Sequence, residues 1–372
     1  MKEKQYDYLI VGSGLYGATF AQQAVAAGKR VLVIEKRDHV GGNVYTENID
    51  GICVHKYGPH IFHTNDEEVY RYLSEFCTFK DFVNSPKAYY KGKYYSLPIN
   101  MNTMTQLWGN ITVKEAKEKV HLQGGGISRR NSQAASLEER AVSVFGKDIY
   151  ETLIEGYSMK QWGRDCSDLP ASIIKRLPMR YSFDNNYYNA KYQGIPVGGY
   201  TEMIEKMLKG ATVRLREDYF SNREYYDSIA SKTVFSGSID SYFEYALGHL
   251  QYRTIRFDTM SLDMDYYQEC AVVNYTDIDV PWNRITEHKW FGNENVPKTV
   301  ITKEFCDECG EGDEPYYPIL DEKNRELLKK YNNLARKCGN TFFGGRLGKY
   351  MYLDMDATVR MALDDARKAL CD

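Results

Sequence analysis

The chain has 372 residues, enough for a large core and two or three structural units. Its 48 basic and 51 acidic residues give a net charge of −3, which argues against nonspecific nucleic-acid binding. No run approaches the roughly 18 apolar residues of a membrane-spanning helix, and no charged and apolar leader precedes the first predicted strand. We therefore expect a soluble cytoplasmic protein that binds neither nucleic acid nor membrane.

The first 35 residues predict a strand, a turn, a helix and a second strand. Residues 8–11 are short and apolar, as in a buried strand. Gly12, Gly14 and Gly17 follow at the spacing G-x-G-x-x-G and lead into a helix of small residues. The second apolar strand ends in Glu35, whose carboxylate is placed to bind ribose hydroxyls. Together these features predict a dinucleotide-binding unit, in which the glycines let the backbone approach the pyrophosphate.

A second pair of glycines bears on the choice of cofactor. Arg37 is followed by Gly41, Gly42 and Asn43 in the pattern R-x-x-x-G-G. This order resembles the FAD-binding class of two-dinucleotide flavoproteins, whereas plain NAD-binding Rossmann enzymes lack the second pair. The resemblance implies FAD, with Gly42 and Asn43 among the residues that bind it.

The histidines and cysteines do not predict a metal site. His55, His60 and His63 do not share one helical face, and no carboxylate lies between them. Cys306 and Cys309 form a lone pair among acidic residues, without the second pair or histidine that zinc would need. We expect loops at both places and no metal.

The rest of the chain alternates between helical and strand patterns. The predicted elements are a hairpin at 81–97, helices between 101 and 160, strands at 213–215 and 233–236, alternating strands between 250 and 305, an amphipathic helix at 321–338 and a last helix ending at Leu370. The strand at 233–236 is expected to return to the Rossmann sheet.

The predicted fold class is α/β, an FAD-binding Rossmann-like domain with a helical insertion and an antiparallel sheet domain. The Rossmann-like domain is expected to combine residues 1–80, 200–245 and 336–372. The helical domain is expected at 100–178. The antiparallel sheet domain is expected to combine 81–99, 179–199 and 246–335.

Seven further segments, taken with the opening motif, resemble the bacterial UDP-galactopyranose mutase family. They are GPHIFHT (58–64), EGYSMKQWG (155–163), IKRLP (174–178), DNNYYN (184–189), NRITEHK (283–289), EPYYPI (314–319) and GGRLGKYMYLDMD (344–356). They run in order through almost the whole chain, which chance would seldom produce.

The resemblance implies an isomerase that interconverts UDP-galactopyranose and UDP-galactofuranose without net redox change, for galactofuranose biosynthesis. In the family, N5 of reduced FAD attacks the anomeric carbon of the sugar and UDP leaves. A transient reductant such as NAD(P)H and a homodimer are also implied.

The same resemblance assigns roles to residues of this chain. Arg176 and Arg284 match the two arginines that hold the diphosphate, a role that suits guanidinium groups. Arg176 lies in a segment that is a mobile lid in the family, and Trp162 matches the residue at its base. Tyr157 matches the aromatic that stacks on uracil, and His60 a histidine near the reactive face of the flavin.

Further matches surround the sugar and the diphosphate. Tyr187, Tyr317 and Tyr352 match tyrosines there, although the adjacent pairs 187/188 and 316/317 leave the register open by one residue. Asn84 matches a residue near the sugar. Leu153 stands where the family usually has an aromatic residue, so that an aliphatic contact is expected at part of the uracil site.

A second flavin contact is expected near the C-terminus. Arg346, Asp354 and Met355 match residues where a helix N-terminus approaches the isoalloxazine ring, and a positive helix end there favours the anionic reduced flavin. Asp354 is equally suited to cap that helix.

Two other functions share the opening motif. A flavin-dependent amine oxidase-like oxidoreductase would turn over electrons, but the paired arginines favour a nucleotide-sugar. A nonenzymatic FAD protein that only binds UDP-sugar would form no furanose product. Whether an N-acetylated sugar is accepted stays open.

Overall fold

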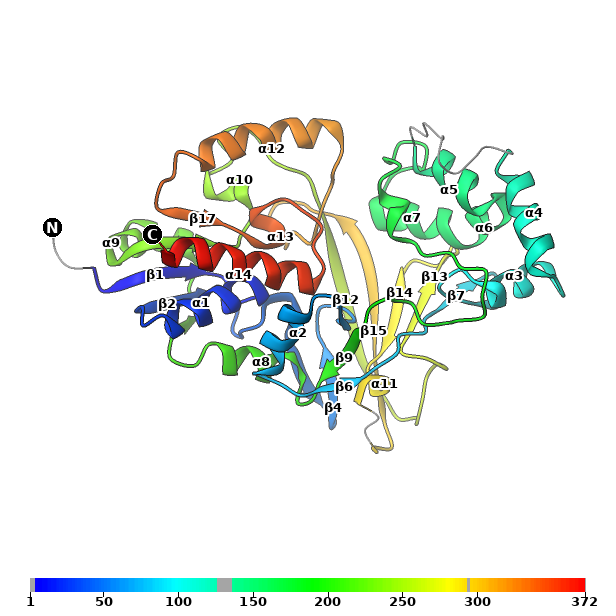
Figure 1. The fold of residues 1–372 in the computed structure, drawn as a ribbon, viewed down its shortest axis with the longest axis horizontal. Coiled ribbons are helices and arrows are strands. Elements are labelled where there is room, and N and C mark those ends of the chain that lie inside the picture. Colours follow the sequence, from blue (N-terminus) through cyan, green and yellow to red (C-terminus); the bar gives the residue numbers. More distant parts are fainter. Residues whose placement is uncertain (1–3, 126–135, 293–294, 372) are drawn as a thin grey trace.

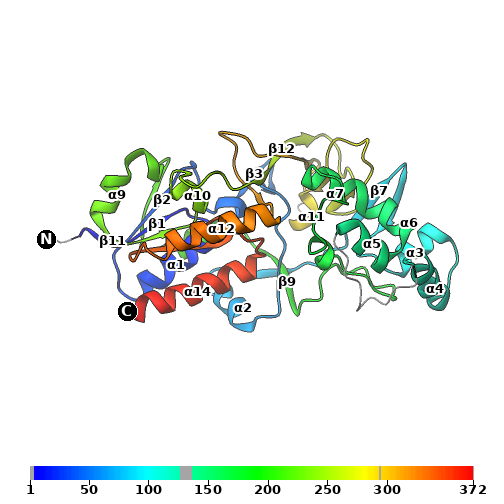
Figure 2. The ribbon, with the colours of Figure 1, turned by 90° about the horizontal axis from the view of Figure 1, so that it is seen from above.

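The structure, a computed structural model, describes residues 4–125, 136–292 and 295–371. The molecule is elongated, with a Rossmann-like unit at one end, a helical unit at the other and a twisted sheet between them (Figures 1 and 2). Both ends of the chain lie at the Rossmann-like end (Figure 1).

The Rossmann-like unit is built on a parallel sheet of five strands in the order β10-β2-β1-β11-β17. Its strands are β1 (Tyr6–Val11), β2 (Val31–Glu35), β10 (Thr212–Leu215), β11 (Ala230–Phe235) and β17 (Thr341–Phe343). The strand predicted at 233–236 does return to this sheet, because β11 pairs in parallel with β1. Strands from three distant parts of the sequence therefore meet side by side.

Helices cover both faces of this sheet because its strands are apolar on both sides. On one face, Tyr8 and Ile10 of β1 pack with α1 (Leu15–Ala26), α8 (Gly199–Met207) and α14 (Met355–Cys371). On the other, Leu9 packs with α9 (Arg223–Ile229), α10 (Ile239–Tyr242) and α12 (Glu322–Ala335). Small residues in α1, such as Ala18 and Ala21, are fully buried and let α14 approach closely.

The central sheet has seven strands in the order β16-β12-β15-β14-β13-β7-β8. They are β7 (Lys87–Tyr90), β8 (Lys93–Ser96), β12 (Tyr252–Leu262), β13 (Val272–Tyr275), β14 (Arg284–Glu287), β15 (Thr299–Glu308) and β16 (Tyr317–Pro318). The hairpin predicted at 81–97 is confirmed as β7 and β8. The expectation of a wholly antiparallel sheet needs one correction, since β7 pairs in parallel with β13. These two strands lie far apart in sequence, so no short turn dictates their direction.

Two small sheets link the larger units. Antiparallel β3 (Thr46–Ile49) and β4 (Ile52–His55) form one. Strand β9 (Tyr192–Pro196) lies between β5 (Phe62–Thr64) and β6 (Phe79–Asp81) in the other. The second sheet joins residues that we expected in different domains, and the three domain boundaries stay a prediction.

The helical unit has a core of its own. It contains α3 (Met101–Trp108), α4 (Val113–Gln123), α5 (Leu137–Phe145), α6 (Lys147–Ile149), a π-helical turn (Tyr150–Ile154) and α7 (Glu155–Trp162). Among the helices in the described part of the chain, none has both the length and the apolar character to cross a bilayer.

Replacing Gly17 by alanine should separate β1 from α1. A Cβ at this position would lie 2.0 Å from the carbonyl oxygen of Gly12 and 3.1 Å from Cγ2 of Ile10. We expect the free energy of unfolding to fall by about 1–3 kcal/mol, the usual cost of overpacking, in urea titrations followed by circular dichroism. The control is Gly339→Ala, where the added Cβ meets no atom within 4 Å. Equal stabilities of the two variants would contradict this prediction.

Candidate active site

Arg284 lies at the start of β14, where the central sheet faces α7. Its Nη2 donates a hydrogen bond to the hydroxyl of Tyr157 over 2.8 Å, and its Nη1 lies 3.8 Å from Oε2 of Glu304. The Nε atom is buried and has no hydrogen-bond partner within the described residues. The guanidinium is therefore held on two sides and keeps a donor for an anion.

Glu304 is the counter-charge, and the sequence analysis missed it. It stands opposite Arg284 in the antiparallel pairing of β14 and β15, with only 5% of its side chain exposed. Burial raises the pKa of Glu304, and the charge of Arg284 opposes this rise. Burial alone would lower the pKa of Arg284, but Glu304 and the phenol of Tyr157 raise it, so the guanidinium stays charged. The sequence pattern does not show which residues of two strands are paired.

Aromatic rings form a wall beside this cation. Tyr317 and Tyr352 stack with centroids 5.2 Å apart and planes at 9°. Trp162 is the last residue of α7, and its ring centroid lies 6.4 Å from that of Tyr317. The guanidinium carbon of Arg346 lies 5.3 Å from the ring of Tyr317 and 5.1 Å from that of Tyr352. Residues from three separate sequence motifs thus meet in one place.

The tyrosine pair 316/317 divides its contacts. Tyr316 donates its hydroxyl to the backbone carbonyl of Tyr57 over 2.7 Å. Tyr317 instead stacks on Tyr352 and lies near Trp162. This division supports Tyr317, rather than its neighbour, as the residue that faces a ligand.

Both members of the pair 187/188 lie at the site. The Tyr187 backbone N–H donates to the carbonyl of Asn84 over 2.8 Å. Tyr188 stacks on His63 with centroids 3.7 Å apart, and burial raises its pKa to about 12 although Arg284 opposes the shift. Asn84 is buried, and its Oδ1 has no partner in the described structure. The register of this pair therefore stays open.

His60 lies close to Arg346 and Arg284. Burial, with the charges of Arg346 and Arg284, lowers its pKa to about 4, so the imidazole is neutral near pH 7. Its Nδ1 lies 2.8 Å from the carbonyl oxygen of Gly58. Because a carbonyl only accepts hydrogen bonds, Nδ1 carries the proton and Nε2 is left as an acceptor.

The predicted cofactor glycines form a close-packed cradle. Gly12 has φ of +98°, and a Cβ there would lie 2.3 Å from Oγ of Ser236. A Cβ on Gly42, which has φ of +55°, would lie 2.9 Å from Cα of Gly14. Gly14 precedes α1 without a side-chain cap in the described structure, and the first turn of α1 has no acidic residue. The free N–H groups and the open backbone fit a pyrophosphate.

Polar groups at the end of β2 complete the cradle. Oε2 of Glu35 accepts hydrogen bonds from the backbone N–H and the hydroxyl of Ser13 over 2.9 and 2.8 Å. Nη2 of Arg37 donates to Oδ1 of Asn43 over 3.1 Å, while its buried Nη1 has no partner among the described residues. These donors and acceptors suit the ribose and phosphate part of a dinucleotide.

The C-terminal motif lies between the cradle and the aromatic wall. Arg346, in the short helix α13 (Gly345–Gly348), donates to the carbonyl of Leu353 over 2.9 Å. Asp354 directly precedes α14, and Met355 is its first residue. The helix begins near the middle of the molecule and runs to its outer end (Figure 1), so its positive end lies at the site.

Arg176 is the one predicted site residue whose side chain lies outside the described part of the structure. Its backbone ends a 3-10 turn at Ile173–Arg176. Its contact with the diphosphate and the mobility of the lid stay predictions.

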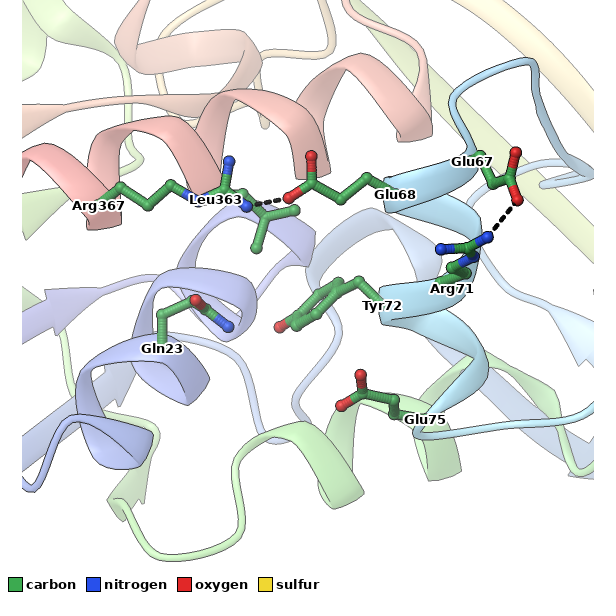
Figure 3. A pocket seen from close by; sticks show the side chains of 8 residues that line it. All are labelled: Gln23, Glu67, Glu68, Arg71, Tyr72, Glu75, Leu363 and Arg367. Atoms are coloured by element: carbon green, nitrogen blue, oxygen red, sulfur yellow. Dashed lines mark hydrogen bonds and ion pairs between the residues drawn. The ribbon is translucent and has the colours of Figure 1, made fainter.

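A surface pocket of about 510 Å³ lies elsewhere, between α1, α14 and α2 (Glu67–Ser74). Figure 3 shows that acidic and basic side chains line it, among them the ion pairs of Arg71 with Glu67 and of Arg367 with Glu68. None of the predicted site residues lines this pocket. Nor do the described His, Cys, Asp and Glu side chains form a group that could hold a metal ion.

Comparisons with known proteins identify the family of this chain. The profile of the UDP-galactopyranose mutase family matches residues 152–352, and that of an NAD(P)-binding Rossmann-like domain matches residues 10–76. The "Probable UDP-galactopyranose mutase" of Klebsiella pneumoniae is 41% identical, over 97% of this chain and 94% of its own. The dTDP-fucopyranose mutase of Escherichia coli is 38% identical, over 96% of this chain and 97% of its own.

Solved structures extend the likeness to the fold. A crystal structure of reduced UDP-galactopyranose mutase has a TM-score of 0.77 and 12% identity, over 98% of this chain and 94% of its own. A putrescine oxidase has a TM-score of 0.58 at 14% identity, over 99% of this chain and 100% of its own. Identities this low show the fold alone, whereas the full-length sequence matches and the family profile show the family. The chain belongs to the UDP-galactopyranose mutase family, whose members are pyranose–furanose mutases of nucleotide-sugars.

Proposed function

We propose that this protein interconverts UDP-galactopyranose and UDP-galactofuranose with reduced FAD and no net redox change. The observation that carries the proposal is the partly buried Arg284, which is held by Tyr157 and Glu304 and has a buried Nε left to donate. Such a group suits a diphosphate that gains negative charge as its bond to the sugar breaks.

FAD fits the cradle. Gly12, Gly14 and the start of α1 would hold its pyrophosphate, and Glu35 its ribose. Arg346 and the N-terminus of α14 would lie near its ring system. Bound and reduced, the flavin supplies the nucleophile for the anomeric carbon.

The chain itself would position the substrate. Tyr157 would stack on uracil and Trp162 would stand at the base of the lid, while the hydroxyls of Tyr317 and Tyr352 would bind the diphosphate or the sugar without adding charge. His60 offers Nε2 as a hydrogen-bond acceptor. Arg176 would bring a second cation to the leaving UDP when the lid closes.

A second substrate has specific support. The Escherichia coli relative is named for dTDP-fucopyranose, and its identity to this chain is 38% against 41% for the Klebsiella protein. Identities this similar do not separate the two nucleotide-sugars. A cytoplasmic homodimer with a transient nicotinamide reductant completes the proposal.

The first test is chromatography of UDP-galactofuranose after incubation with FAD-loaded protein, with and without dithionite. We expect the pyranose isomer only in the reduced sample, because the nucleophile requires reduced flavin. A parallel incubation with dTDP-fucofuranose tests the second substrate. Absence of product from UDP-galactofuranose in a fully reduced sample would reject the galactose proposal. Product from the fucose sugar alone would assign the second substrate.

Arg284→Ala should lower kcat/KM by about 100-fold or more, because a developing phosphate charge loses its charged donor. The control is Arg256→Ala on β12 of the same sheet, where the guanidinium is exposed and lies over Phe305. Steady-state kinetics with UDP-galactofuranose and dithionite would measure both. Similar losses in the two variants would count against a role for Arg284 at the diphosphate.

The neutral state of His60 predicts a pH profile. Because its pKa is lowered to about 4, lowering the pH from 9 to about 5 should not protonate it, although an unperturbed histidine would titrate near 6.5. We expect His60→Asn to lower kcat/KM by about tenfold or more at every pH, with a profile parallel to that of the wild type. An acidic limb near pH 6.5 that disappears in the variant would disprove the neutral assignment.

A further inference from the structure

Lys160 makes an unusual set of contacts that the site described above does not use. Its Nζ lies within hydrogen-bond distance of four backbone carbonyl oxygens, those of Tyr275, Asp277, Val280 and Trp282, at 2.8, 2.8, 2.9 and 3.0 Å. All four belong to the connection between β13 and β14, or to the strand end that leads into it. One ammonium group thus contacts this connection at several points along its length.

That loop leads directly into the arginine of the site. Trp282, which supplies the last carbonyl, stands two residues before Arg284. Asn283 continues the strand pairing on both sides, because its N–H donates to the carbonyl of Glu304 and its carbonyl accepts from the N–H of Tyr275, each over 2.8 Å. The loop held by Lys160 therefore ends at the residue whose backbone pairing marks the start of β14, directly before Arg284.

Lys160 also belongs to the helix that touches Arg284 directly. Tyr157, three residues earlier on α7, accepts the hydrogen bond from Nη2 of Arg284. Residues three apart lie on the same side of a helix. Helix α7 therefore contacts Arg284 itself through the hydroxyl of Tyr157, and the loop that precedes Arg284 through the ammonium of Lys160. Resting on the proposed function, we propose that Lys160 is a positioning residue, which holds the β13–β14 loop so that Arg284 meets both Tyr157 and the diphosphate.

The backbone of α7 is held by other groups, so the role of the Lys160 side chain can be tested separately. Arg253 of β12 donates from Nε to the carbonyl of Gln161 over 3.0 Å and from Nη2 to that of Lys160 over 3.2 Å. In the π-helical turn that precedes α7, the carbonyl of Thr152 accepts a hydrogen bond from the hydroxyl of Thr276, a residue of the loop, over 2.7 Å. Removing the ammonium frees the four loop carbonyls and takes away neither of the Arg253 contacts with α7.

The charge of Lys160 follows from its surroundings. Burial lowers its pKa to about 8, while the Asp277 carboxylate of the loop and the Cys306 thiol of β15 favour the charged form. Arg253 faces the backbone of Lys160 from β12. Raising the pH through 8 converts an ammonium with three N–H donors into an amine with two, which weakens its hold on the loop.

The test is calorimetry of UDP binding to the full-length, FAD-loaded protein, which requires neither reduction nor a sugar. Lys160→Met should bind UDP about tenfold more weakly or worse. The control Lys114→Met, at a side chain that is 86% exposed, should bind like the wild type. Equal affinities of Lys160→Met and the wild type would overturn the proposal. UDP binding without any mutase activity would instead reject the proposed function and leave the role of Lys160 standing.

Two further measurements separate positioning from a general loss of stability. Tyr157→Phe and Lys160→Met both act through Arg284, so their effects on UDP affinity should not multiply. We expect the double variant to bind UDP at most about threefold more weakly than the single variant that has the lower affinity. Losses that multiply would overturn the coupling. If Lys160→Met does not fold, the wild type still answers, because its UDP affinity should fall between pH 7 and 9. An unchanged affinity over that range would reject the proposal. If the wild type does not bind UDP, the same titrations are made with dTDP, and an unchanged dTDP affinity in Lys160→Met would reject the proposal.

Discussion

The partial burial of the Arg284 guanidinium beside the buried Glu304 is the constraint around which the substrate side of the molecule is built. A cation that is partly removed from water is stabilised by a counter-charge and by hydrogen-bond partners, and loss of the cation would leave the buried carboxylate without its counter-charge. Glu304 and Tyr157 provide these interactions from a neighbouring strand and from α7. The pairing of β14 with β15 and the position of α7 are therefore tied to the group that would bind the diphosphate.

The cofactor side and the substrate side of the site would bind phosphate groups by different interactions. The cradle around Gly12 and Gly14 offers backbone N–H groups and a helix dipole, without a cationic side chain in the first turn of α1. The substrate side combines the fixed charge of Arg284 with aromatic rings such as Tyr317. The two meet at His60 and Arg346, where the wall of tyrosines adjoins the N-terminal end of α14. A flavin ring and a sugar would be brought together at this boundary.

Much of the fold could be predicted because its signals are local. The order of β1, α1 and β2 follows from two apolar runs around a glycine turn, and the hairpin of β7 and β8 turns at Gly92. The parallel pairing of β7 with β13 was not predicted, because the sequence of a strand does not show which distant strand it pairs with. Glu304 and Lys160 were missed for the same reason. In the sequence they are an acid in an alternating strand and a lysine on a helix.

The sequence by itself determined where the backbone must turn tightly and which motifs belong to one family, because steric limits at glycine and short motifs act within a few residues. Only the tertiary structure decided between the two adjacent tyrosines. Tyr317 lies near Trp162, whereas Tyr316 donates its hydroxyl to the backbone carbonyl of Tyr57. It also decided that Glu304 balances Arg284. Burial, strand pairing and charge balance depend on residues far apart in the chain, and these quantities exist only once the chain has folded.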